Sequence, residues 1–268
     1  MLHIAEPAGA RRTAPQWQAF LEMGFRPLYL GGCLWAAVSV ALWVFAPHAL
    51  QGVLAGVFWH AHETLWGFVA TIAVGFLLTA GANWTGINPI RGRALGVLAL
   101  AWAVARLGFL VPGRPAFGVA AVCELLFFAG ALAALARAVY AARNRRNYGG
   151  PLLVLGLGAA DALYLWAVWT GDYAVLMQRF QAGLLCMALI ALLVARRVIP
   201  FFAMRAVAGL AIPMCTRSGQ WQLAAGVLAI GCLLAGWVPG VAAALAVAGA
   251  LAVWHVLAWQ PWSVRRVP

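Results

Sequence analysis

Two imidazoles and a carboxylate stand close together in an otherwise apolar stretch, where the chain reads Trp59-His60-Ala61-His62-Glu63. An ionisable group in the hydrocarbon core of a bilayer costs about 2.5 to 3.5 kcal/mol on insertion scales, so it needs a compensating partner. Imidazole and carboxylate are both common metal ligands. The segment therefore indicates a bound metal, or a metal inside a macrocycle.

The spacing of the two histidines predicts that they serve different partners. Residues two apart on a regular α-helix point about 200° away from each other, so His60 and His62 cannot both ligate one metal. Glu63 follows His60 by three residues and is expected to orient its imidazole. His62 shares a face with Trp59 and Trp66, an apolar wall suited to the plane of a porphyrin. The pattern is not the HExxH zinc motif, whose histidines lie four apart.

Four further ionisable residues interrupt other apolar runs: Arg106, Glu124, Asp161 and Arg179. At a rise of 1.5 Å per residue, all of them fall within about 5 to 15 Å of the same side as the two histidines. Charges that face lipid are expensive, so these groups are expected to converge on one interior cavity open toward the outside. The alternative is that they form interhelical ion pairs that fix the packing.

Composition determines the class of protein. The chain has 268 residues, 65% of them hydrophobic and 9% charged, and a mean hydropathy of +0.92. This predicts a polytopic membrane protein of the all-α class. The 18 basic residues, all arginine, give a net charge of +12 that topology explains, so no nucleic-acid partner is expected. The five cysteines are single, which argues against structural disulfides.

Apolar runs long enough to cross a bilayer predict eight transmembrane helices. The expected ranges are 28–46, 57–81, 94–111, 116–141, 151–170, 176–203, 221–238 and 240–259. The last two are separated only by Val238-Pro239-Gly240, so one long kinked helix is the alternative there. The predicted organisation is a cytoplasmic, interfacial segment at 1–27, a helical bundle at 28–259 and a cytoplasmic tail at 260–268.

Arginine placement orients this bundle. Under the eight-span prediction, almost all loop arginines fall on one side, and the opposite loops contribute only Arg114. The positive-inside rule then places both termini in the cytoplasm.

Several separate motifs resemble the NnrS family. They are 24–27 (GFRP), 59–63 (WHAHE) continuing to 67–68 (GF), 75–80 (GFLLTA), 83–86 (NWTG), 197–202 (RVIPFF), His255 and 260–262 (QPW). The resemblance covers nearly the whole chain. Members typically continue for several more spans, so a short form is expected.

The resemblance implies a multi-pass protein of the bacterial inner membrane that carries haem, expected to be b-type, with copper as a second metal. It also implies a role in the nitric oxide response, in denitrification or under nitrosative stress, with an unidentified electron donor. His60 and His62 become the candidate metal and haem ligands. Arg106 and Arg179 become the candidate partners of the haem propionates.

Two functions from different classes are compatible with these residues. In the first, a haem near the outer side binds or transforms nitric oxide, as an oxidoreductase would, and Glu63, Glu124 and Asp161 are the catalytic groups that supply protons. In the second, the same cluster is the proton or substrate site of a membrane transporter or permease. No convincing internal repeat, which carriers often show, is found between the two halves.

Overall fold

The computed structural model describes residues 16–207 and 209–262, and these form helices joined by short loops, with no strand assigned within these two ranges. The eight long helical stretches are α2 (Phe25–Phe45), α3 with η2 and α4 (Gly56–Thr85), α5 (Gly92–Gly108), α6 (Arg114–Ala141), α7 (Gly149–Thr170), α8 (Leu176–Ala206), α9 (Thr216–Leu234) and α10 (Val238–Trp259). The all-α prediction is confirmed for the described residues.

Each of the eight predicted ranges coincides with one of these stretches. Six of them are long and apolar enough to cross a membrane by length and composition, and α5 and α9 are the two that are not. A multi-pass membrane protein is therefore supported. The count of eight spans, the cytoplasmic placement of the termini and the domain boundaries remain predictions.

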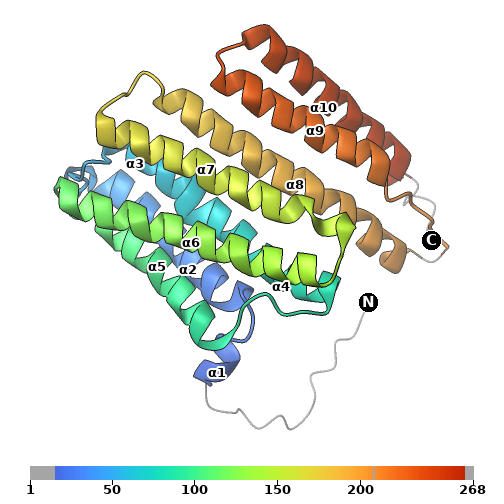
Figure 1. Cartoon of the computed structure of the whole chain (residues 1–268), viewed down its shortest axis with the longest axis horizontal. Helices are drawn as coiled ribbons and strands as arrows, with labels where there is room; N and C mark the ends of the chain where they lie inside the picture. The colour runs from blue at the N-terminus through green and yellow to red at the C-terminus, as the bar shows by residue number, and fades with distance from the viewer. Residues whose placement is uncertain (1–15, 208, 263–268) are drawn as a thin grey trace.

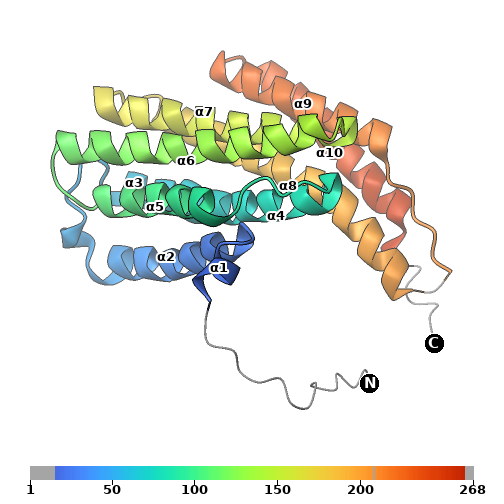
Figure 2. The ribbon, with the colours of Figure 1, turned by 60° about the horizontal axis from the view of Figure 1, so that its bottom comes forward.

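The stretch from Gly56 to Thr85 lies at the centre of the bundle. It packs against α2 on one side and against α5, α6 and α8 on others. In Figure 2, α2 lies below this central stretch and α5, while α6 and α7 lie above. The α9–α10 pair stands at the edge of the bundle, where α9 packs against α8 and α10 packs mainly against α9 (Figure 1).

The last two helices are separate, which excludes the alternative of one long kinked helix. They are joined by Ala235, Gly236 and Trp237, and Gly236 adopts a positive φ of 72°. The turn therefore comes before the expected break at Val238-Pro239-Gly240. Pro239 instead occupies the first turn of α10, where its missing N–H costs no helical hydrogen bond.

The central stretch contains a π-helical segment, η2, which runs from Glu63 to Ala70 between α3 (Gly56–His62) and α4 (Thr71–Thr85). The Thr71 hydroxyl donates to the carbonyls of Trp66 at 3.1 Å and Gly67 at 3.0 Å at its end. π segments are rare and often occur at functional sites. The sequence periodicity did not predict this one.

At the N-terminal end, α1 (Trp17–Phe20) is a single turn whose Trp17 is exposed. A helical turn therefore occurs within the predicted N-terminal segment, and the interfacial position of that segment stays a prediction. Residues 1–15 and 263–268, which belong to the predicted N-terminal segment and tail, lie outside the described residues.

Candidate metal centre

His62 lies at the C-terminal end of α3, and carboxylates face both of its ring nitrogens. Nδ1 is 3.0 Å from Glu63 Oε1. Nε2 is 3.0 Å from Asp161 Oδ1 and 3.5 Å from Glu124 Oε2. This ring therefore either donates from both nitrogens as an imidazolium, or donates from Nδ1 and offers the Nε2 lone pair to a cation or to a protonated carboxyl.

Arg106, near the end of α5, holds the other side of the cluster. Its guanidinium donates from Nη1 to Glu63 Oε2 at 2.8 Å and also forms an ion pair with Glu124. Glu63 Oε2 accepts a further hydrogen bond from the indole N–H of Trp35 at 2.5 Å. Glu63 thus has a donor on each oxygen, and its carboxylate is fixed against the imidazole of His62.

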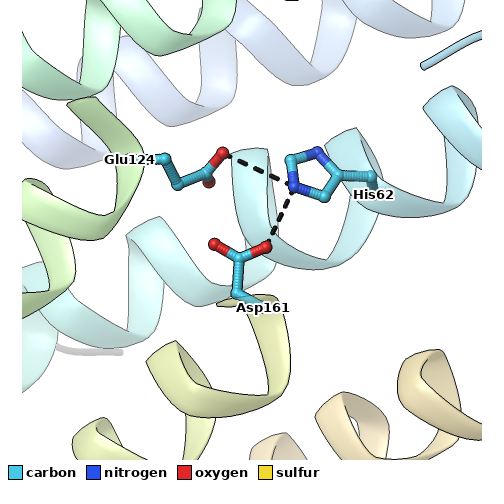
Figure 3. A group of neighbouring side chains, drawn as sticks. All are labelled: His62, Glu124 and Asp161. Carbon is cyan, nitrogen blue, oxygen red and sulfur yellow. Dashed lines mark hydrogen bonds and ion pairs between the residues drawn. The ribbon is translucent and has the colours of Figure 1, made fainter. Parts of the chain in front are cut away.

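Three residues of this cluster present atoms that could hold a metal ion. One ligand atom each from His62, Glu124 and Asp161 lie within 4.8 Å of one another. Figure 3 shows the three side chains, which come from α3, α6 and α7, pointing toward a common point. Within the described part of the chain, Glu124 Oε1 and Asp161 Oδ2 are buried without a hydrogen-bond partner.

The cluster is closed. His62, Glu63, Arg106, Glu124 and Asp161 are each between 0 and 1% exposed. The predicted convergence of charges from several helices therefore occurs, but these side chains do not face the expected outward-open cavity. The expectation of interhelical ion pairs is also met, because Arg106 joins Glu63 of η2 to Glu124 of α6.

Aromatic rings surround the imidazole of His62. The ring centroids of Phe109, Trp66 and Tyr164 lie 5.0, 5.3 and 5.7 Å from it. Trp66 is fully buried and donates from its indole N–H to the Leu157 carbonyl at 3.2 Å. Gly183 of α8 permits this, since a Cβ there would lie 2.4 Å from Trp66 Cζ2. Trp59 is also fully buried and packs edge-on against Trp35 at 6.4 Å.

His60 is separated from the cluster, as the 200° argument predicted. Its ring stacks on Trp43 of α2 with centroids 4.1 Å apart, and its Nδ1 is buried without a hydrogen-bond partner among the described residues. The expected pairing of His60 with Glu63 is wrong, because Glu63 contacts His62 instead. The backbone from His60 to Glu63 is regular, and it is the side chain of Glu63 that turns away from His60, toward Trp35 and Arg106.

Arg179 does not join the cluster. It is partly exposed near the start of α8 and makes no side-chain hydrogen bond or ion pair with any residue in the described ranges. Arg106, expected beside a haem propionate, is instead occupied by two carboxylates of the chain itself.

Several residues of the site were missed by sequence reasoning. Trp35 and Tyr164 carry no charge, so the search for ionisable groups in apolar runs passed over them. Gly67 was quoted only as part of a motif, yet a Cβ on it would lie 2.5 Å from Arg106 Nη1 and 2.6 Å from Glu63 Oε2. A glycine one turn after a buried acid was the available signal for this close approach.

The comparisons with known proteins bear on the same residues. Neither the comparison with curated proteins nor that with solved structures finds a significant match. The profile of the family described as NnrS protein matches residues 19–268, which include the whole cluster and nearly the whole chain. With this match and the motifs that resemble the same family, the chain belongs to the NnrS family.

Proposed function

We propose that this chain is a metal-binding membrane protein of the nitric oxide response, with a centre formed by His62, Glu124 and Asp161. The observation that carries the proposal is the convergence of one imidazole nitrogen and two carboxylates within 4.8 Å, fully buried. Glu63 accepts from the opposite nitrogen of the same ring. Metal-ligating histidines commonly have such a carboxylate behind them, which fixes the tautomer and the ring orientation.

Charge balance supports a divalent cation at this position. The cluster contains three carboxylates and one guanidinium, so with a neutral imidazole it carries two negative charges. Protonation of His62 would leave one negative charge, so neutrality without a metal also needs a proton on one of the three carboxyls. A divalent ion beside a neutral His62 makes the whole group neutral, and unbalanced charge is what a low-dielectric interior penalises most.

The donor set indicates which cofactors fit. One imidazole and two carboxylates suit Zn²⁺, Fe²⁺, Mn²⁺ or Cu²⁺, whereas Cu⁺ prefers thiolate and thioether ligands. His62 does not fit as an axial ligand of haem iron, because two carboxylates stand within 3.5 Å of Nε2, where the macrocycle would lie. A b-type haem, which the family implies, is better matched to His60, whose buried Nδ1 lacks a partner among the described residues.

The burial of the centre favours nitric oxide over an ionic substrate. Nitric oxide is small and uncharged, so it can pass through the apolar packing around the centre without the desolvation cost that a charged substrate would meet. The same burial gives no support to the alternative of an outward-open transport site. A metal held there would supply a coordination position for the gas. The residues of the chain would anchor the ligating ring through Glu63, neutralise the carboxylates through Arg106 and exclude water through Trp66.

The test is metal analysis with an absorption spectrum on the purified protein and two variants. We expect His62→Ala to lose the bound divalent metal, while His60→Ala keeps the metal and loses any haem absorption. The two histidines are matched controls for each other because they lie two residues apart in one helix. Unchanged metal content in His62→Ala, or a wild-type protein without stoichiometric metal, would disprove the assignment.

A further inference from the structure

Arg196 of α8 is buried against the first turn of α9, away from the metal centre. The residue is 7% exposed. A Cβ added to Gly219 would overlap Arg196 Nη1, so the guanidinium occupies the space that any larger residue at 219 would need. His255 of α10 lies within electrostatic reach of the same guanidinium. Three helices therefore enclose this positive charge.

No aspartate or glutamate in the described residues of α8, α9 and α10 compensates Arg196, and its electrostatic neighbours there are the Cys215 thiol and His255. The sequence contains no aspartate or glutamate after Asp172, while seven arginines follow it. Within the described residues the guanidinium forms neither a hydrogen bond nor an ion pair. An arginine residue that is more than nine-tenths buried and has no carboxylate beside it is costly, which points to an anion from outside the chain.

The start of α9 adds further donors at the same place. The first amide of this helix that donates to a preceding carbonyl is that of Gly219, to Cys215 at 2.9 Å. Cys215 provides no side-chain cap, so the amides before Gly219 point out of the helix start. The helix dipole places partial positive charge at the same end. The Ser218 hydroxyl, also in this first turn, is already engaged, since it donates to the Cys215 carbonyl at 3.2 Å and lies 2.9 Å from His255 Nε2.

A cavity of about 590 Å³ adjoins this turn. Its lining includes Thr216, Arg217 and Ser218, together with Trp221 and Trp254, which are 64% and 59% exposed. Tryptophans of this kind are typical of the depth of lipid head groups in a membrane protein. The surroundings therefore combine anion-binding groups with an interfacial position.

We propose that Arg196 and the first turn of α9 bind a phosphate-class oxoanion, supplied by the head group of an anionic phospholipid or by inorganic phosphate. The guanidinium would hold two oxygens of the anion, and the free amides of the first turn of α9 would hold the others. The site is independent of the proposed metal centre.

The experiment measures thermal unfolding of the delipidated full-length protein in an uncharged, phosphate-free detergent, followed by tryptophan fluorescence. Inorganic phosphate is titrated in one arm, with sodium chloride of equal ionic strength as its blank. Phosphatidylglycerol is titrated in the other arm, with a phosphate-free glycolipid as its blank. A rise of the wild-type midpoint in the first arm identifies the free ion as sufficient. A rise confined to the second arm identifies the lipid as the source.

Arg196→Gln should abolish the rise of the unfolding midpoint in whichever arm shows it. Without ligand, the unfolding midpoint of this variant should not fall, because the substitution removes an uncompensated charge. Arg205→Gln is the control, since its exposed guanidinium stacks on Phe201. No rise with either probe, or an equal rise in Arg196→Gln, would overturn the proposal.

Discussion

At the scale of single residues, Glu63 determines how the centre is arranged. It contacts His62 through one oxygen, and Trp35 and Arg106 through the other. Because all of these groups are buried, Glu63 cannot rotate without leaving a donor unsatisfied. The orientation of the His62 ring therefore depends on a residue outside the proposed ligand set.

Replacing Glu63 with glutamine should weaken metal binding without removing a proposed ligand. The neutral amide keeps the shape but loses the ion pair with Arg106 and the negative charge behind the imidazole. We expect metal affinity to fall by about 10- to 100-fold, the usual effect of losing such a supporting carboxylate. Competition with a chelator of known affinity measures the change. Asp172→Asn, an exposed acid outside the cluster, should leave affinity unchanged.

Gly67 should tolerate no side chain. A methyl group would lie 2.5 Å from Arg106 Nη1 and 2.6 Å from Glu63 Oε2, so Gly67→Ala must displace the buried ion pair. We expect a loss of about 1 to 3 kcal/mol in stability, as for overpacked sites, accompanied by loss of metal. Thermal unfolding in detergent measures it. Gly249→Ala in α10, where a Cβ meets nothing within 4 Å, should be neutral or stabilising. Equal effects of the two variants would contradict this account.

At the scale of elements, the π segment Glu63–Ala70 sets the register between the two halves of the central helix. An α-helix continued through this range would turn Trp66 and Gly67 to other faces, away from Leu157 and Arg106. This is also why helical-wheel reasoning separated His60 from His62 correctly, since both precede the segment. The same reasoning failed for Glu63, where the segment begins.

Deleting Thr64, an exposed residue of this segment, should convert it toward regular α-helix. The residues on its two sides would then rotate relative to each other, and the cluster should lose its metal while the protein remains helical. Metal analysis together with circular dichroism checks this. Thr64→Ala, which keeps the number of residues, should retain the metal. Full metal content in the deletion variant would show that the π geometry is not needed.

At the scale of the whole molecule, much of the fold followed from the sequence because apolar runs and Pro-Gly breaks are strong signals. All eight expected ranges contain a long helix, and the charges of four of them meet. Which helices would be neighbours was not predictable, because apolar faces such as those of α5 and α10 carry no pairing information. The exclusion of Arg179 and the closure of the cavity depend on that packing.

Both termini should be cytoplasmic if the arginine-rich end faces inward. A reporter that is active only in the cytoplasm should be active when fused after Pro268 and inactive when fused in the Val111–Gly113 loop. Activity at the Val111–Gly113 position would reverse the orientation. Activity at neither or at both would contradict the five spans predicted between this loop and the C-terminus.

The ion pair between Glu63 and Arg106 joins residues 43 positions apart, and His62 meets Asp161 across 99 positions. During synthesis, the central helix must therefore enter the bilayer while its charges still lack these partners. Insertion of one such group costs about 2.5 to 3.5 kcal/mol, which the apolar remainder of the helix must outweigh. When the short α5 follows, Glu63 of the central helix is already available as the partner of its Arg106. Because of this order along the chain, earlier helices provide the charged partners that lower the cost of inserting later ones.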